Sequence, residues 1–261
     1  MICRDIITEL EKTYPPQVAE SWDNPGLQAG RWEKEIQRVY IALDATDAVI
    51  RHAIEEKADL ILTHHPLLMS GLKKIHTGDL FGRRLITLIQ NDIACYAMHT
   101  NYDIVKMAPL ASAMLGLQEE KILAVTCTLP DGREGGFGML GNLPHRMSLA
   151  ECAAYVKQVF GIPEVKVFGD LQKEVFCAAI LPGSGKSMVK DAIQKGVQVY
   201  ISGDFGHHDG IDAVDQGLCV IDAGHYGIEH IFIRQMKEEM EERFPKLEVL
   251  TEPVCHPFEM I

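Results

Sequence analysis

The order of the predicted strands and helices constrains the fold of this chain more than any other feature. Strand-like segments over 38–45, 59–65 and 93–100 alternate with amphipathic helical segments over 46–58 and 78–92. An alternating β-α-β-α-β order is typical of a sheet with parallel strands covered by helices. We therefore predict an α/β fold (α+β by some criteria) in which ligand-binding residues lie at the carboxyl ends of the strands.

The alternation continues to the end of the chain, with a glycine-rich passage over 135–148 that we predict to form turns. A long helix over 226–245 and a short final strand are predicted to return to the first part of the sheet structure. We predict two interlinked α/β units with mixed sheets flanked by helices. The first unit is residues 1–125 with 222–261 returning to it, and the second is residues 126–221.

Composition excludes several classes of function. The chain has 261 residues, 47% of them hydrophobic, and a net charge of -12, which argues against nucleic acid as a partner. No apolar run approaches the roughly 20 residues of a membrane span, and the amino-terminal segment does not resemble a signal peptide. The seven cysteines are scattered with no C-x-x-C pair, so neither a disulfide framework nor a thiolate zinc site is indicated. We predict a cytoplasmic protein without a membrane segment.

Two adjacent histidines end the apolar run "LILTHHPL". On a regular strand, His64 and His65 would point to opposite faces of the sheet. Pro66 indicates that the strand has already ended, so the backbone can turn and both rings can converge on one point. The alternative is one buried histidine with an exposed neighbour.

Ligand-type side chains follow three other predicted strands. The stretch "HTNYD" places His99 and Asp103 four residues apart, and "DAGHYGIEH" does the same for His225 and Glu229 at the start of a helix, where this spacing puts both on one face. Each of these stretches alone could equally contain a surface pair or a turn-forming residue without a binding role. Their recurrence at successive strand ends favours a shared site. The third stretch, "SGDFGHHD", contributes Asp204, His207, His208 and Asp209.

The stretch "ILPGSGKS" resembles a phosphate-binding loop but does not satisfy its pattern. The motif G-x-x-x-x-G-K-[ST] needs a glycine where this chain has Ile180. We therefore interpret the glycines of this stretch as a tight turn that leads into a helix.

Five ordered motifs, "SWDNPGLQAG", "LILTHHPL", "HTNYD", "ISGDFGHHD" and "DAGHYGIEH", resemble those of the NGG-one-interacting-factor-three-like family. Its members are dinuclear-metal-centre proteins that many genomes label as GTP cyclohydrolase I type 2 homologues. At 261 residues the chain resembles the short form of the family. The resemblance implies a homohexamer with a small-molecule substrate, and a metal site at strand carboxyl ends between the two units.

The resemblance also implies the ligands of two divalent ions per chain. Three imidazoles and two carboxylates suit Zn, Fe, Mn or Co and leave coordination positions open for water. Candidates for proton transfer or for orienting the ligands are His99, Asp204 and His208, while the roles of His207 and of Trp22–Asn24 stay open. The implied metal ligands are His64, His65, Asp103, His225 and Glu229.

Three functions remain open at this point. The first is a metal-dependent hydrolase that acts on a small nucleotide-like substrate, with GTP ring opening as one version. The second is a non-catalytic metal-binding protein for storage, delivery or sensing, which the lack of a guanine-recognition motif keeps open. The third is an interaction scaffold with structural metals, against which the open coordination positions argue.

Overall fold

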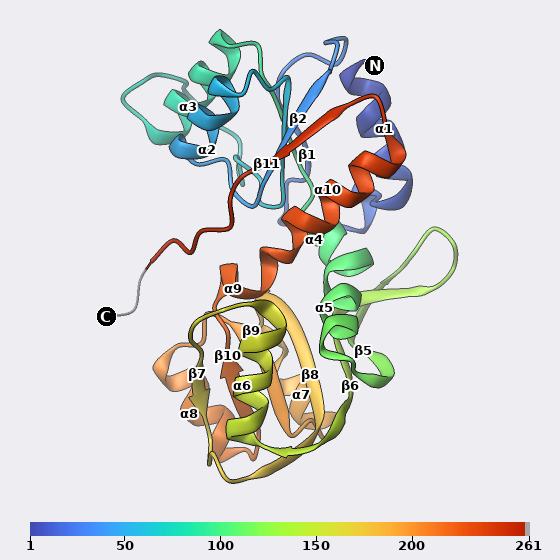
Figure 1. Ribbon diagram of the computed structural model, residues 1–261, viewed down its shortest axis with the longest axis vertical. Coiled ribbons are helices and arrows are strands. Elements are labelled where there is room, and N and C mark those ends of the chain that lie inside the picture. Colours follow the sequence, from blue (N-terminus) through green and yellow to red (C-terminus); the bar gives the residue numbers. More distant parts are fainter. Residues whose placement is uncertain (259–261) are drawn as a thin grey trace. The chain divides into compact units, whose positions relative to one another are not determined.

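The computed structural model describes residues 1–258, which form two compact units (Figure 1). Unit 1 comprises Met1–Tyr102 and Phe232–Val254, and unit 2 comprises Asp103–Ile231 and, within the described part, residues 255–258. The domain limits expected from the sequence, at residues 125 and 222, stay a prediction. The last three residues of the predicted 222–261 segment lie outside the described part. The α/β class with two mixed, helix-flanked sheets is confirmed.

Unit 1 is built on a five-stranded sheet in which one strand is antiparallel to the rest. Three neighbouring strands, β2, β3 and β4, are parallel, so their carboxyl ends lie along one edge. The strands, in sheet order, are β1 (Gly26–Ala29), β4 (Ala94–Ala97), β3 (Leu60–Thr63), β2 (Arg38–Ala42) and β11 (Glu248–Thr251). The helical segments are α1 (Cys3–Thr13), η1 (Pro16–Val18), α2 (Asp47–Glu55), α3 (Leu80–Gln90), α4 (Thr100–Tyr102) and α10 (Ile231–Arg243).

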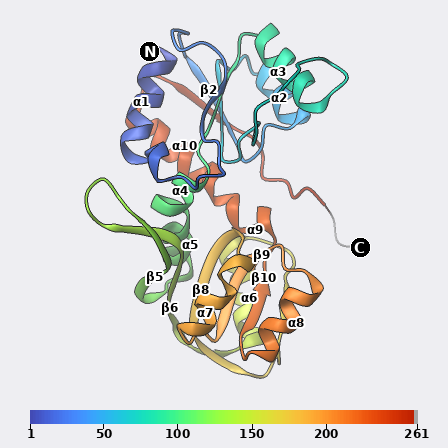
Figure 2. The same ribbon diagram turned by 180° about the vertical axis from the view of Figure 1, so that it is seen from behind.

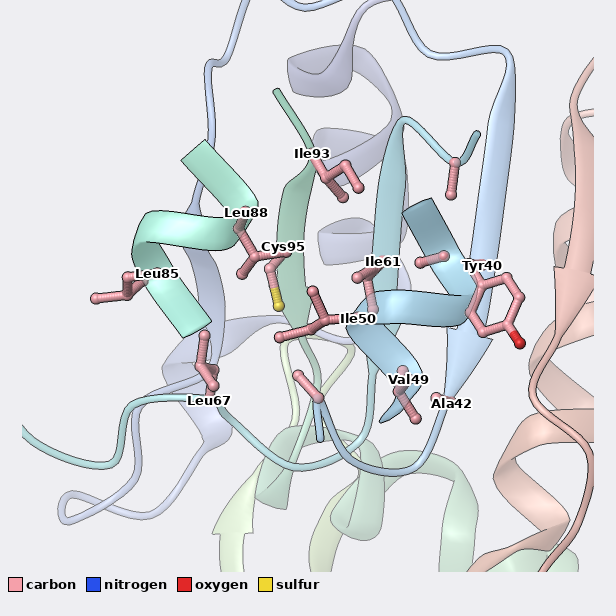
Figure 3. Packing of buried hydrophobic residues seen from close by; sticks show 13 residues of the cluster. Tyr40, Ala42, Val49, Ile50, Ile61, Leu67, Leu85, Leu88, Ile93 and Cys95 are labelled. Atoms are coloured by element: carbon pink, nitrogen blue, oxygen red, sulfur yellow. The ribbon is translucent and has the colours of Figure 1, made fainter. Parts of the chain in front are cut away.

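Alternate side chains of the unit 1 strands bury against helices on both faces of the sheet. Figure 3 shows one face, where Ile61 and Cys95 meet Ile50 of α2 and Leu88 of α3. On the other face lie α1 and α10, and the hydroxyl of Tyr14, which follows α1, donates to Glu239 of α10 at 2.6 Å. Burial on both faces explains why the sequences of these strands are nearly continuous apolar runs.

Unit 2 is built on a six-stranded mixed sheet. Strands β8, β9 and β10 are parallel, and α6 covers one face of the sheet while α7 and α8 cover the other (Figures 1 and 2). The strands, in sheet order, are β5 (Gln118–Thr128), β6 (Glu134–Ser148), β8 (Glu174–Ser184), β9 (Val199–Gly203), β10 (Cys219–Asp222) and β7 (Lys166–Phe168). The helical segments are η2 (Asp103–Met107), α5 (Ala108–Leu115), α6 (Leu149–Phe160), η3 (Lys186–Met188), α7 (Val189–Gln194), α8 (His207–Asp215) and α9 (His225–Glu229).

The prediction of turns over 135–148 is wrong, because this passage forms the long strand β6. Its glycines allow close approach of the neighbouring backbones rather than a change of direction. A Cβ atom at Gly136 would lie 1.9 Å from the carbonyl oxygen of Ala124, and one at Gly141 would lie 2.6 Å from that of Gln118. Glycine in a strand thus marks tight strand packing here.

The single helix predicted over 226–245 consists of α9 and α10, with His230 at the junction. The amide of His230 donates to the carbonyl oxygen of Tyr226 at 3.1 Å, so the helical hydrogen bonding of α9 extends to His230. Among the helices of residues 1–258, none has the length and apolar character needed to cross a bilayer.

Candidate metal centre

The two adjacent histidines converge in unit 1, as the proline after them predicts. Strand β3 ends at Thr63, whose hydroxyl donates to the carbonyl oxygen of His65 at 2.8 Å, and the amide of His65 donates to Leu43 at 3.0 Å. The resulting turn brings the rings of His64 and His65 to 4.8 Å between centroids. The ring of His99, which follows β4, lies 5.2 Å and 5.4 Å from these two.

The three imidazoles have the arrangement of potential metal ligands. One ring nitrogen of each of His64, His65 and His99 can be chosen so that all three lie within 4.8 Å of one another. His64 is completely buried and its Nδ1 lies 2.9 Å from the carbonyl oxygen of Met98. A carbonyl oxygen can only accept, so Nδ1 carries the proton and Nε2 carries the lone pair that a metal needs.

Carboxylates hold the other two rings of unit 1 in the same way. The Nδ1 atom of His65 lies 2.9 Å from Asp44, and the Nδ1 atom of His99 lies 2.8 Å from Asp23. A carboxylate that accepts from Nδ1 fixes the ring and leaves Nε2 as the ligand nitrogen, which is the usual support for histidine at metal sites.

Asp23 is the most firmly held of these carboxylates. Its side chain is 0% exposed, and its second oxygen accepts from the amide and the hydroxyl of Thr100 at 3.0 and 2.6 Å. Burial alone would raise the pKa of Asp23, but the hydrogen bonds from His99 and Thr100 outweigh burial and lower it to about 2. Asp23 is therefore a charged group inside the protein, stabilised by its donors.

In unit 2, His225 and Glu229 face each other across one turn of α9. The Nε2 atom of His225 lies 3.0 Å from Oε2 of Glu229, and the glutamate is only 3% exposed. On the other side of the ring, Nδ1 of His225 lies 2.8 Å from Asp204. The pair is therefore not the surface i,i+4 pair that the spacing alone also allowed.

This geometry suits a divalent cation. With the Nδ1 proton directed at Asp204, the lone pair of Nε2 faces a carboxylate oxygen, and this arrangement needs a proton or a metal ion between the two atoms. Two ligands each about 2.1 Å from one ion and at right angles to each other lie about 3 Å apart. The imidazole and carboxylate donors suit Zn, Fe, Mn or Co, so the residues present fit a metal site.

The buried carboxylate of Asp222, at the end of β10, holds the loops that lead to the His225–Glu229 pair. It accepts from the amides of Phe205 and Gly224 at 3.2 and 3.0 Å, and the ammonium of Lys166 lies 2.7 Å away. These bonds fix the segments that follow β9 and β10, which carry Asp204 and His225.

Glycine at position 183 makes room for the carboxylate of Glu229. A Cβ atom there would lie 2.3 Å from Oε1 of Glu229 and 3.6 Å from Nε2 of His225, and Gly183 has a φ of +78°. The stretch "PGSGKS" thus ends β8 and forms part of the wall beside His225 and Glu229. The interpretation of these glycines as a tight turn therefore leaves out the close approach to Glu229.

The remaining predicted residues occupy different positions. Asp204 holds His225 from a left-handed backbone, with φ of +60°. Asp103 begins the π-helical turn η2. His207 and His208 are exposed in the first turn of α8, with their rings 5.2 Å apart, and within residues 1–258 neither belongs to a group of potential metal ligands. Sequence patterns do not pair Asp23 with His99 or Asp44 with His65, and these partners meet only in the folded chain.

Imidazoles held at Nδ1 after parallel strands, together with the buried carboxylate of Glu229 in α9, define a class of two-unit α/β proteins with groups of potential metal ligands. The sequence profile of Duf34/NIF3 (NGG1p interacting factor 3) matches residues 1–256. The chain belongs to this family.

Named relatives and solved structures agree with this assignment. A "GTP cyclohydrolase 1 type 2 homolog" from Clostridium perfringens is 35% identical over 265 residues, with 100% of both chains covered. Another from Streptococcus pneumoniae is 37% identical, with 90% of this chain and 89% of the relative covered. The crystal structure of a Bacillus cereus protein related to NIF3 has a TM-score of 0.91 at 26% identity, covering 100% of this chain and 99% of that one.

Proposed function

We propose that this chain is a dinuclear metal-binding protein that acts as a metal-dependent hydrolase on a small nucleotide-like substrate. The proposed ligands are those implied by the family motifs: His64 and His65 from unit 1, and Asp103, His225 and Glu229 from unit 2. The observation that carries the proposal is the facing pair of His225 and Glu229, whose ligand atoms lie 3.0 Å apart beside the Asp204 carboxylate.

Each unit supports the proposal by itself. In unit 1, Met98 and Asp44 orient the rings of His64 and His65, so that both present Nε2. In unit 2, Asp204 does the same for His225. Divalent ions bound by such residues lower the pKa of a bound water and stabilise developing negative charge on a substrate oxygen. The carbonyl and carboxylate groups that accept from Nδ1 hold each imidazole ring in place and keep its proton on Nδ1, so that Nε2 is left for the metal.

The names of the two relatives give GTP as one substrate to test, because both are called GTP cyclohydrolase 1 type 2 homologs. Glu229 is the carboxylate that we propose bridges the two ions. His99 and Asp204 are proposed to orient ligands or to move protons, and His208 keeps the status of a candidate that lies on the exposed part of α8.

Metal analysis of untagged protein is expected to give about two transition-metal ions per chain. A screen of nucleotides and phosphoesters, GTP included, with Zn, Fe, Mn and Co is expected to show hydrolysis that a chelator abolishes. His64→Ala should lower both the metal content and the rate. The matched control is His52→Ala, because the Nδ1 atom of His52 also faces a carboxylate, that of Glu252, at 3.0 Å.

The outcomes separate the functions. Two bound ions with no turnover on any substrate would favour the alternative of metal storage, delivery or sensing. One ion or none in a metal-replete preparation would contradict the dinuclear centre, and equal effects of His52→Ala and His64→Ala would contradict the assignment of its ligands.

A closed homo-oligomer, with six chains as the resemblance implies, is proposed as the working assembly. Light scattering at micromolar concentration is expected to return about six times the mass of 29.1 kDa. A monomer at that concentration would contradict this part of the proposal.

A further inference from the structure

The motif residues Trp22 and Asp23 have a defined place in unit 1 that the five proposed ligands do not explain. The amide of Asp23 donates to the carbonyl oxygen of Glu20 at 2.9 Å, and the amide of Glu20 donates to the hydroxyl of Thr100 at 2.9 Å. This network fixes the loop before β1 to the segment that follows β4. It places a buried carboxylate directly behind the ring of His99.

His99 lies in a position suited to a metal ligand rather than to a core residue. Its ring is 5.2 Å from His64 and 5.4 Å from His65, in nearly perpendicular orientations of 73° and 74°. Its side chain is 15% exposed. Its Nδ1 atom lies 2.8 Å from Oδ1 of Asp23, so the lone pair of the ring is on Nε2.

We propose that His99 is a third nitrogen donor at the His64–His65 pair, and that Asp23 is the positioning residue that makes it one. This inference rests on the proposed metal centre and adds His99 to its ligands, in place of the orienting or proton-transfer role given to His99 above. Asp23 acts in two ways: it accepts the Nδ1 proton, and its bonds to Thr100 fix the direction of the ring. The aspartate of the "WDN" motif thus has its role through His99.

A purely structural role for Asp23 is the competing explanation, because its bonds to Thr100 also anchor the loop. The two explanations differ in one respect. If Asp23 acts through His99, its replacement has no further effect on metal binding once His99 is removed. If it acts through the fold, the effect persists in the absence of His99.

Cobalt(II) binding provides the test, because Trp22 lies beside the ring of His99, with centroids 5.9 Å apart. The chain has two tryptophans, so Trp32→Phe leaves Trp22 as the only one. Cobalt bound near His99 is expected to quench Trp22 emission, and calorimetry gives the affinity. His99→Ala is expected to weaken cobalt binding by about 10- to 100-fold, and Asp23→Asn by about 10-fold, the range for groups that support metal ligands.

In the His99→Ala background, Asp23→Asn is expected to change cobalt affinity less than twofold. The matched control is Asp59→Asn, since Asp59 accepts from the amides of Gln37 and Arg38 at 2.8 and 3.1 Å in the same unit. Asp59→Asn is expected to leave cobalt binding unchanged. Nitrogen NMR of the metal-free native chain is expected to show the His99 proton on Nδ1.

The results that overturn the inference differ from those that overturn the metal centre. If His64→Ala weakens cobalt binding but His99→Ala does not, His99 is not a donor. An equal loss from Asp23→Asn with and without His99 assigns Asp23 to the fold alone. A His99 proton on Nε2 in the native chain refutes the inference even if Asp23→Asn does not fold. If His64→Ala has no effect either, the proposed metal centre itself fails.

Discussion

Glu229→Gln is expected to weaken the binding of both ions, whereas His64→Ala or His65→Ala is expected to weaken mainly one. The proposed role of Glu229 is to bridge the ions with an anionic group. Divalent ions about 3.5–4 Å apart, as in dinuclear sites, repel by on the order of 20 kcal/mol at an effective dielectric near 20. A neutral amide removes the bridging charge that offsets this repulsion. Metal titration by calorimetry, with circular dichroism as the folding check, measures the effect.

Glu239→Gln is the matched control, because Glu239 is also a shielded helical glutamate, with its side chain 10% exposed. It accepts from the Tyr14 hydroxyl at 2.6 Å and pairs with Arg243 at 2.8 Å, so its loss affects the packing of α1 on α10. Stoichiometry and affinity for metal should stay as in the native chain. Retention of two ions with native affinity by Glu229→Gln would show that Glu229 does not bridge them.

Gly183→Ala is expected to weaken metal binding by more than tenfold while the fold is retained. The added Cβ atom would lie 2.3 Å from Oε1 of Glu229 and 3.3 Å from its Cδ, so the carboxylate has to move. A side chain can move more easily than backbone, and we therefore expect the change to appear in metal affinity rather than in loss of structure. The φ of +78° adds a backbone cost of roughly 1–2 kcal/mol for alanine.

Gly196→Ala separates these two effects. Gly196 has a similar φ of +71°, but an added Cβ atom would meet no atom within 4 Å. Both variants should lose a similar free energy of unfolding from the strained backbone, measured by urea denaturation. Only Gly183→Ala should lose metal affinity in calorimetry. Equal metal affinity in the two variants would show that Gly183 does not set the position of Glu229.

Sequence patterns predict the parts of the fold that depend on apolar periodicity. The helix over 46–58 and the strand over 59–65 correspond to α2 and β3, with the Thr46 side chain accepting from the amide of Val49 at the start of α2. The patterns fail at β6, where the glycines serve close strand packing and resemble turn residues. The spacing of the glycines alone does not contain this information, because the contacts come from the paired strand β5.

The candidate site also has parts that local sequence predicts and parts that it does not. The convergence of His64 and His65 follows from a local feature, the proline that ends the strand, and is confirmed by the ring distance of 4.8 Å. The partners of the imidazoles do not follow from local features. Asp23 is 76 residues from His99, and Asp204 is 21 residues from His225. For Glu229, burial distinguishes a site residue from a surface pair, and burial arises only in the folded chain.

At Asp204 the residue that would best suit the left-handed backbone is not the residue that can hold His225. At φ of +60°, glycine would avoid the cost that a Cβ atom brings, so a chain adapted only for resistance to heat would carry glycine here. Glycine has no carboxylate to accept the Nδ1 proton of His225. Directed evolution of this protein for thermal tolerance alone should therefore favour Asp204→Gly, and a simultaneous requirement for bound metal should retain the aspartate.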